Sequence, residues 1–159
     1  MILVTVGMSE YNFDRLFKII DELVDERIIT DKKIVVQSGN SNYTSKNFES
    51  FDMIENEKFN KLVDDCDFII SHAGTGSVVP ALKKNKKVII FPRLEKFSEH
   101  LDNHQVELAN LFLEKKYALV AYNKEQLIDC ISKIKDFVPQ KFISNNKVIN
   151  DLIIDFIEK

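Results

Sequence analysis

The chain has 159 residues, of which 45% are hydrophobic and 30% are charged, the balance of an ordinary soluble globular domain with its own core. A net charge of −3 excludes a global basic field that would attract nucleic acid. The two cysteines, Cys66 and Cys130, lie far apart among apolar neighbours, so we expect buried, reduced thiols and no metal site.

The apolar run at residues 2–6 is typical of a buried strand and ends at Gly7. No basic residues precede it, and it is too short for a signal peptide or a membrane span. We therefore expect a cytoplasmic protein with no direct membrane insertion.

Apolar periodicity along the chain predicts strands that alternate with helices. Strands are predicted over residues 2–6, 34–37, 48–53, 68–71, 87–91 and 118–121. Helices are predicted over residues 12–27, 56–64, 78–84, 99–115, 124–137 and 146–158. This alternation predicts an α/β fold with a doubly wound parallel sheet. Residues 1–138 would form a Rossmann-like domain, and residues 139–159 a C-terminal amphipathic helix.

A turn of small residues joins the fourth predicted strand to the helix that follows it. It contains His72, Ala73, Gly74, Thr75, Gly76 and Ser77. Free amides and the positive end of a helix dipole make such a turn a natural anion site, and its glycines let a ligand approach the backbone. We predict a bound phosphate or diphosphate. The alternative is a tight strand–helix turn without a ligand.

Other predicted strands are also followed by small or polar residues. These are Gly7 after the first strand, Gln37, Ser38 and Gly39 after the second, and Arg93 after the fifth. The carboxyl ends of parallel strands share one edge of the sheet, where ligands of doubly wound folds bind. The sequence therefore predicts one cleft lined by four loops.

A second polar cluster lies at the start of the long predicted helix and contains Asp102, Asn103, His104 and Gln105. Its carboxylate, amide and imidazole groups suit a hydroxyl-rich ligand such as a sugar, although Asp102 or Asn103 could instead cap the helix. His100 and His104 have the spacing of a metal pair, but no third ligand accompanies them, so no metal is predicted. We also find no nucleophile–base–acid triad.

With these motifs, the chain resembles the C-terminal, donor-binding half of GT-B glycosyltransferases of the MurG-like family 28. The likeness lies in residues 4–7 and 13–16, 37–43, 71–77 and 92–109. It extends to the separate subunits of two-part transferases. One such group is the soluble subunit of the eukaryotic enzyme that adds the second N-acetylglucosamine of dolichol-linked chitobiose. The other is a bacterial capsule and exopolysaccharide group called PssE-like, to which residues 92–105 look closest.

The resemblance implies a UDP-sugar donor, with His72 as the catalytic residue and no cofactor. The donor-binding residues that it implies are Gly7, Gln37, Ser38, Gly39, Ala73, Gly74, Thr75, Gly76, Ser77, Arg93, Asp102, Asn103, His104 and Gln105. The turn at 74–77 would hold the diphosphate, the cluster at 102–105 would face the sugar, and Arg93 and the loop after Gln37 would serve the uridine. Pro80 stands where the family often has a glutamate that bonds the ribose hydroxyls; proline is acceptable near a helix's first turn but cannot make that bond.

One Rossmann-like half does not make a complete GT-B enzyme, so the resemblance implies a membrane-anchored partner subunit that binds a lipid-linked acceptor. The expected function is transfer of a hexose or N-acetylhexosamine in capsule or exopolysaccharide biosynthesis, at the inner face of the cell membrane. A helical stripe at Ile149, Leu152, Ile153, Phe156 and Ile157 either docks to the partner or packs on the chain's own core. The alternatives are a non-catalytic accessory subunit that enhances a partner glycosyltransferase and a nucleotide-binding regulatory domain.

Overall fold

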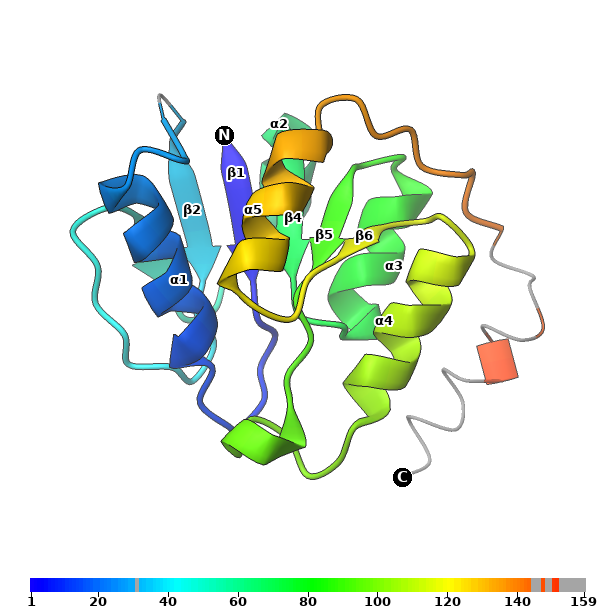
Figure 1. The fold of residues 1–159 in the computed structure, drawn as a ribbon, viewed down its shortest axis with the longest axis horizontal. Helices are drawn as coiled ribbons and strands as arrows, with labels where there is room; N and C mark the ends of the chain where they lie inside the picture. Colours follow the sequence, from blue (N-terminus) through cyan, green and yellow to red (C-terminus); the bar gives the residue numbers. More distant parts are fainter. Residues whose placement is uncertain (31, 144–146, 148–149, 152–159) are drawn as a thin grey trace.

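The computed structural model describes residues 1–30, 32–143, 147 and 150–151, and a parallel sheet forms its centre (Figure 1). Its strands are β1 (Ile2–Thr5), β2 (Ile34–Gln37), β3 (Glu49–Phe51), β4 (Phe68–Ser71), β5 (Val88–Ile90) and β6 (Leu119–Val120). They lie in the order β3-β2-β1-β4-β5-β6, and every neighbouring pair is parallel. The predicted doubly wound α/β fold is confirmed.

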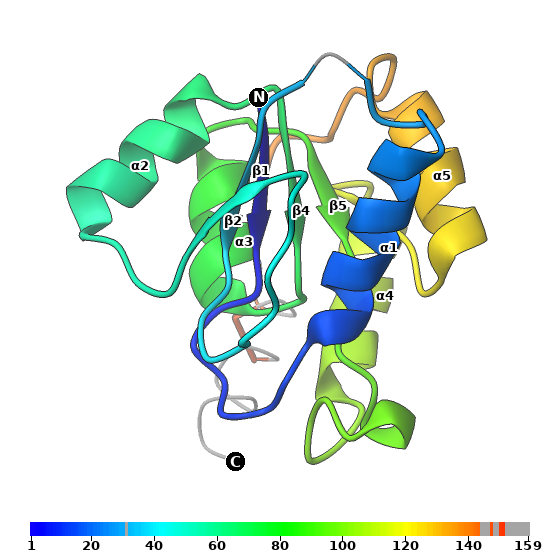
Figure 2. The same cartoon turned by 90° about the vertical axis from the view of Figure 1, so that its left-hand side faces the viewer.

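Helices cover both faces of the sheet (Figure 2). They are α1 (Asp14–Asp25), α2 (Asn56–Asp65), α3 (Thr75–Lys83), α4 (His104–Glu114) and α5 (Lys124–Lys133), with a 3₁₀ turn, η1 (Glu95–Phe97), before α4. One core forms between the sheet and helices α1 and α5, and the other between the sheet and helices α2, α3 and α4. Successive strand residues serve opposite cores, as Leu3 and Val4 do, because side chains alternate across a strand. Burial on both faces explains why β5 is wholly apolar and why β1, β2 and β4 are apolar up to their last residue, whereas the edge strand β3 is largely exposed and carries Glu49 and Ser50.

Strands β2 and β3 are added on one side of β1, and strands β4, β5 and β6 on the other. The order of the strands therefore changes direction between β1 and β4, which are hydrogen-bonded neighbours. Thr5 lies beside Ser71 in the register of this pair, so the loops that follow the two strands leave the sheet side by side. In Figure 1 these carboxyl ends point downward, toward η1. This topological switch point is where doubly wound sheets bind ligands.

The helices predicted over residues 12–27 and 56–64 fall within two residues of α1 and α2 at each end, whereas three other predicted helices differ more from the structure. The helix predicted from residue 99 begins at His104, because the Glu99 side chain turns inward to accept the amide of Leu94. Helix α3 begins at Thr75, so Pro80 is its sixth residue and lies beyond the first turn, contrary to our expectation. Helix α5 ends at Lys133, short of residue 137. The stripe from Ile149 to Ile157 lies outside the described residues, and its docking role stays a prediction.

Candidate functional site

The amino terminus of helix α3 presents backbone donors at the switch point. Gly74 is its N-cap residue, and the carbonyl oxygen of Gly74 accepts the amides of Ser77 and Val78 at 3.2 and 3.0 Å. Within the described part of the chain, the amides of Gly74, Thr75 and Gly76 donate to no acceptor. Consecutive free amides at the positive end of a helix form a site for an anion.

Gly76 leaves open space in front of these amides. A Cβ atom built on it would meet no atom within 4 Å, and its backbone does not adopt a positive φ. The fold therefore does not require glycine at this position. An open approach to the backbone is what a bulky diphosphate would need.

His72 lies between two other glycines. A Cβ atom on Gly74 would lie 2.0 Å from His72 Nε2, and one on Gly7 would lie 2.7 Å from the same atom. Either side chain would displace the imidazole, and the φ of +69° at Gly7 also favours glycine. Gly7 and Gly74 thus make room for His72, a role that the sequence motif does not reveal.

The protonation state of His72 follows from its surroundings. Its Nδ1 lies 3.3 Å from the carbonyl oxygen of Thr5, which can only accept, so Nδ1 carries the proton and Nε2 a lone pair. Burial lowers its pKa to about 4, and the nearby Arg93 guanidinium acts in the same direction. His72 is therefore neutral at neutral pH. It is suited to accept a hydrogen bond and is a weak general base.

The depressed pKa of His72 predicts acid sensitivity. Above pH 6.5 both the folded and the unfolded chain hold it neutral; as pH falls toward 4, only the unfolded chain takes up the proton, so stability is lost. We expect proton uptake by His72 in the unfolded chain to lower the free energy of unfolding by about 2 kcal/mol between pH 7 and pH 5. Urea unfolding of the protein and of a His72→Asn variant checks this. An equal pH dependence in both would contradict it.

Gln37 and Ser38 are buried and make hydrogen bonds inside the fold. Gln37 Oε1 accepts Thr5 Oγ1 at 2.6 Å and the amide of Gly7 at 3.2 Å, and its Nε2 donates to the carbonyl oxygens of Gly7 and Asp52. Ser38 Oγ donates to the carbonyl oxygen of Phe51. In this structure Gln37 holds the loop after β1 and Ser38 binds the end of β3, and contact with a donor stays a prediction for both.

Gly39 packs directly against that loop. Its φ is +57°, and a Cβ atom on it would lie 2.1 Å from the carbonyl oxygen of Gly7. The close approach and the left-handed backbone both require glycine. Gly39 therefore supports Gly7, which in turn makes room for His72.

Arg93 is also an interior residue, with 1% of its surface exposed. Its guanidinium donates to the carbonyl oxygens of Val6, Tyr11 and Glu99 and lies 4.7 Å from the centre of the Phe13 ring. Burial lowers its pKa to about 10, although the charge of Glu99 counters part of this effect. Arg93 ties the loop after β1 to the loop after β5, and its contact with uridine stays a prediction.

Gln105 joins the two loops on the other side of the switch point. Its Oε1 accepts the amide of Ala73 at 3.3 Å and the amide of Arg93 at 2.9 Å. The carboxamide oxygen is thereby fixed, and Nε2 makes no hydrogen bond within the described residues. Gln105 thus lies beside the turn before α3, and its Nε2 is free to donate to a ligand; sugar binding stays a prediction for this residue.

Asp102 Oδ1 accepts the first amide of α4, that of His104, at 3.0 Å, so the alternative that Asp102 caps the helix is confirmed. Its carboxylate also lies between His100 and His104 at 3.1 and 3.4 Å. Burial acts to raise the Asp102 pKa, but the His104 amide and the two imidazoles outweigh it, so the pKa is lowered. Asn103 stands at the N-cap position of α4, but its side chain makes no capping hydrogen bond and donates to Glu95. A role in sugar binding stays a prediction for this cluster.

Sequence reasoning missed the ion pair between Arg15 and Glu99. Arg15 Nε and Nη2 donate to the two carboxylate oxygens at 2.7 and 2.9 Å, and Glu99 is 3% exposed. Arg15 also donates to the carbonyl oxygens of Pro92 and Tyr122. The two residues are 84 positions apart and belong to no local motif, so only the fold reveals that they support the switch point.

Two cavities lie away from the predicted donor residues. One, of about 580 Å³, opens between the start of α1 and η1. The other, of about 550 Å³, lies at the opposite, amino-terminal edge of the sheet. Across the described ranges, no group of three or more His, Cys, Asp or Glu side chains could hold a metal ion. Within the same ranges, no helix combines the length and hydropathy needed to cross a membrane.

The sequence model of the glycosyltransferase family 28 C-terminal domain matches residues 1–151. The chain belongs to this family. Among curated proteins, the family 28 chain is 28% identical over 119 residues to the UDP-N-acetylglucosamine transferase subunit ALG13 of Debaryomyces hansenii, covering 69% of this chain and 56% of that protein. It is 39% identical over 66 residues to the subunit of the same name from Candida albicans, covering 42% and 21%. The family 28 chain thus spans little more than half the length of the first of these relatives.

Solved structures agree on the fold. An NMR structure of ALG13 matches the family 28 chain with a TM-score of 0.66 and 22% identity over 99% of this chain and 96% of that one. A glycotransferase of kitacinnamycin matches with a TM-score of 0.60 and 11% identity, over 99% of this chain and 38% of that one. At these identities the likeness shows the fold alone.

The predicted family is confirmed, but the narrower assignment is corrected. The curated relatives are fungal UDP-N-acetylglucosamine transferase subunits. Of the two groups of separate subunits that the sequence resembles, these relatives belong to the eukaryotic one. The expected role in bacterial capsule or exopolysaccharide biosynthesis is therefore not supported. Within residues 92–105, Arg93 and Glu99 bind other parts of the fold.

Proposed function

We propose that this chain is the donor-binding subunit of a two-component glycosyltransferase that uses UDP-N-acetylglucosamine. The observation that carries the proposal is the row of free amides at Gly74, Thr75 and Gly76, on a helix terminus at the switch point of the sheet. The choice of sugar nucleotide draws support from the relatives, which are named UDP-N-acetylglucosamine transferase subunits.

The diphosphate would rest on these amides, with the Thr75 and Ser77 hydroxyls nearby. The same amides and the helix dipole would stabilise the negative charge that develops on the departing UDP. This chemistry needs no metal ion. The base that deprotonates the acceptor hydroxyl would come from the partner, because His72, with a pKa of about 4, is a weak base.

His72 would bind the donor through Nε2. Since this nitrogen carries a lone pair, it suits a hydroxyl or amide N–H of the sugar and not a phosphate oxygen. Gln105 offers the complementary group, because its Nε2 can donate to a sugar oxygen. The two residues together would orient the sugar against the diphosphate turn.

The partner would be a membrane-anchored subunit that binds a lipid-linked acceptor and recruits this chain to the cytoplasmic face of a membrane. GT-B enzymes place their cleft between two Rossmann-like halves, and the described residues supply one sheet with one switch point. Pro80 favours a second candidate, a non-catalytic accessory subunit, because it replaces the ribose-binding glutamate of the family and has no side-chain hydrogen-bonding group.

Thermal unfolding in the presence of UDP, UDP-N-acetylglucosamine, UDP-glucose and UDP-galactose tests the proposal. At a hundredfold excess over Kd, a ligand that binds only the folded state adds about 2.7 kcal/mol of stability, or roughly 5–10 °C in Tm for a chain of this size. We expect the largest shift with UDP-N-acetylglucosamine. The same assay on the complex with its copurified partner is the control. No shift in that complex would reject donor binding and favour the accessory subunit.

A further inference from the structure

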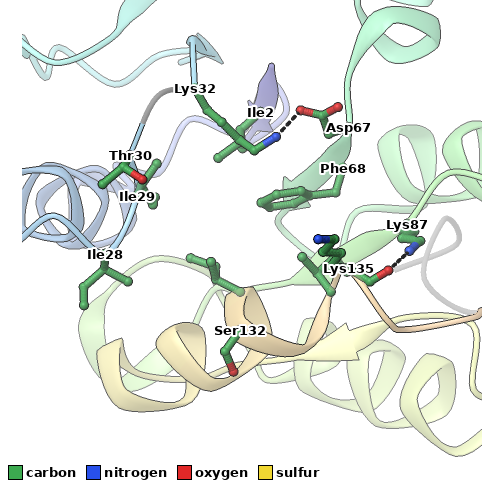
Figure 3. A pocket seen from close by; sticks show the side chains of 12 residues that line it. Ile2, Ile28, Ile29, Thr30, Lys32, Asp67, Phe68, Lys87, Ser132 and Lys135 are labelled. Carbon is green, nitrogen blue, oxygen red and sulfur yellow. Dashed lines mark hydrogen bonds and ion pairs between the residues drawn. The ribbon is translucent and has the colours of Figure 1, made fainter.

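The cavity at the amino-terminal edge of the sheet has an apolar interior (Figure 3). Ile2 and Phe68 line it from β1 and β4, and further isoleucines close it from the segment after α1 and from the end of α5. These isoleucines are Ile28, Ile29, Ile131 and Ile134. Its volume of about 550 Å³ falls within the usual range for sites that bind small organic molecules.

The rim of this cavity carries an excess of positive charge from Lys32, Lys87 and Lys135. Among the described lining residues the one carboxylate is that of Asp67, and it is already paired with Lys32 Nζ at 2.6 Å and with the amino group of Met1 at 2.7 Å. Lys87 Nζ donates to the carbonyl oxygen of Lys135. Lys135 Nζ itself has no partner within the described ranges, so a cation is available beside the apolar interior.

We propose that this cavity binds a single-chain amphiphile with an anionic head, such as an alkyl carboxylate or alkyl phosphate. The hydrocarbon chain would fill the space between the isoleucines and Phe68, and the head would pair with Lys135. A purely apolar ligand would leave the lysine charge unused, whereas a small polar ligand would leave the isoleucine surface uncovered. The site lies at the opposite edge of the sheet from the amides of α3 and does not rest on the function proposed above.

An NMR titration of the full chain with dodecyl phosphate and with dodecanoate, each below its micelle concentration, tests the site. We expect saturable shifts confined to amides around the cavity, such as those of Ile2, Thr30, Phe68 and Ser132. Dodecyltrimethylammonium has the same chain with a cationic head and should bind at least about tenfold more weakly, because it would be repelled by the lysines. Shifts spread over the whole surface, or equal affinity for both heads, would overturn the proposal.

Two pairs of variants separate the site from general charge and hydrophobicity. Lys135→Gln should raise the dissociation constant for dodecyl phosphate about tenfold, whereas Lys133→Gln, whose ammonium pairs with Asp129 outside the cavity, should not change it. Ile28→Ser should weaken binding, whereas Leu113→Ser should not; the side chains are 42% and 47% exposed, so both variants should fold. Equal effects within either pair would reject the site.

The source of the amphiphile is a separate question that a vesicle experiment answers. Flotation with vesicles of anionic phospholipid shows whether the head and chain are taken from a membrane surface. If binding to vesicles depends on Lys135, the source is membrane lipid; if only the soluble amphiphiles bind, it is a free one. Binding to neither would overturn the proposal.

Discussion

Replacing Gly76 by Asp should abolish donor binding without unfolding the protein. The new carboxylate would stand at the amides where we place the diphosphate. Two unit charges about 4 Å apart repel by about 4 kcal/mol at an effective dielectric constant of about 20. We therefore expect the affinity for UDP to fall by at least about 100-fold. Stability should not fall, because a Cβ atom at Gly76 meets nothing within 4 Å and an acidic residue suits the first turn of a helix. Calorimetric titration with UDP and urea unfolding measure the two effects.

Two alanine substitutions, one at Gly76 itself and one at Gly74, serve as controls for Gly76→Asp. Gly76→Ala should raise the free energy of unfolding by about 0.5–1 kcal/mol, since alanine favours the helix and fits the space. Gly74→Ala should instead destabilise the protein, because its Cβ would lie 2.0 Å from His72 Nε2. If Gly76→Asp binds UDP as tightly as the parent protein, the diphosphate does not lie at this helix terminus.

The contrast between these two glycines shows what the sequence could predict about the site. The turn from His72 to Ser77 was recognisable because a helix terminus offers the same backbone amides whatever its side chains are. That Gly74 serves the imidazole and Gly76 the open approach depends on atoms brought together by folding. The motif alone gave both glycines the same role.

Strand positions were predictable where burial on both faces imposes an unbroken apolar run. β2 and β4 have the predicted bounds for this reason, with every residue buried. The start of α4 was not predictable, because the polar residues before it are compatible with a helix. Glu99 lies outside that helix, and its carboxylate binds Arg15 and the Leu94 amide, which are distant or non-helical partners that the local pattern does not show.

Polar residues after the strands were harder to interpret. Gln37 and Arg93 have the position and chemistry of ligand contacts, yet their partners are carbonyl and hydroxyl groups of the fold itself. A sequence shows that a buried polar group must have a partner, but not whether the partner is a ligand or a backbone group from a distant loop.

The carboxylate of Glu99 connects several residues that hold the loops at the carboxyl ends of the strands. Glu99 accepts two hydrogen bonds from Arg15 and one from the Leu94 amide, and its charge also acts on the buried Arg93. Arg93 in turn holds the loop after β1, and its own amide is held by Gln105. Loss of the Glu99 charge would leave the partly buried Arg15 without its ion-pair partner and would remove the negative charge that acts on the buried Arg93.

Glu99→Gln should therefore lower the free energy of unfolding by about 3–5 kcal/mol, because removing one partner of a buried ion pair leaves the other charge uncompensated. Urea unfolding at pH 7 measures the loss. Glu55→Gln is the matched control: its carboxylate pairs with Lys58 on the surface, with exposures of 77% and 66%, and solvent screens that interaction. If the two variants lose equal stability, the Arg15–Glu99 pair contributes no more than a surface contact. If the Glu99→Gln variant also binds UDP more weakly in conditions where the variant stays folded, the ion pair both stabilises and positions the loops at the carboxyl ends of the strands.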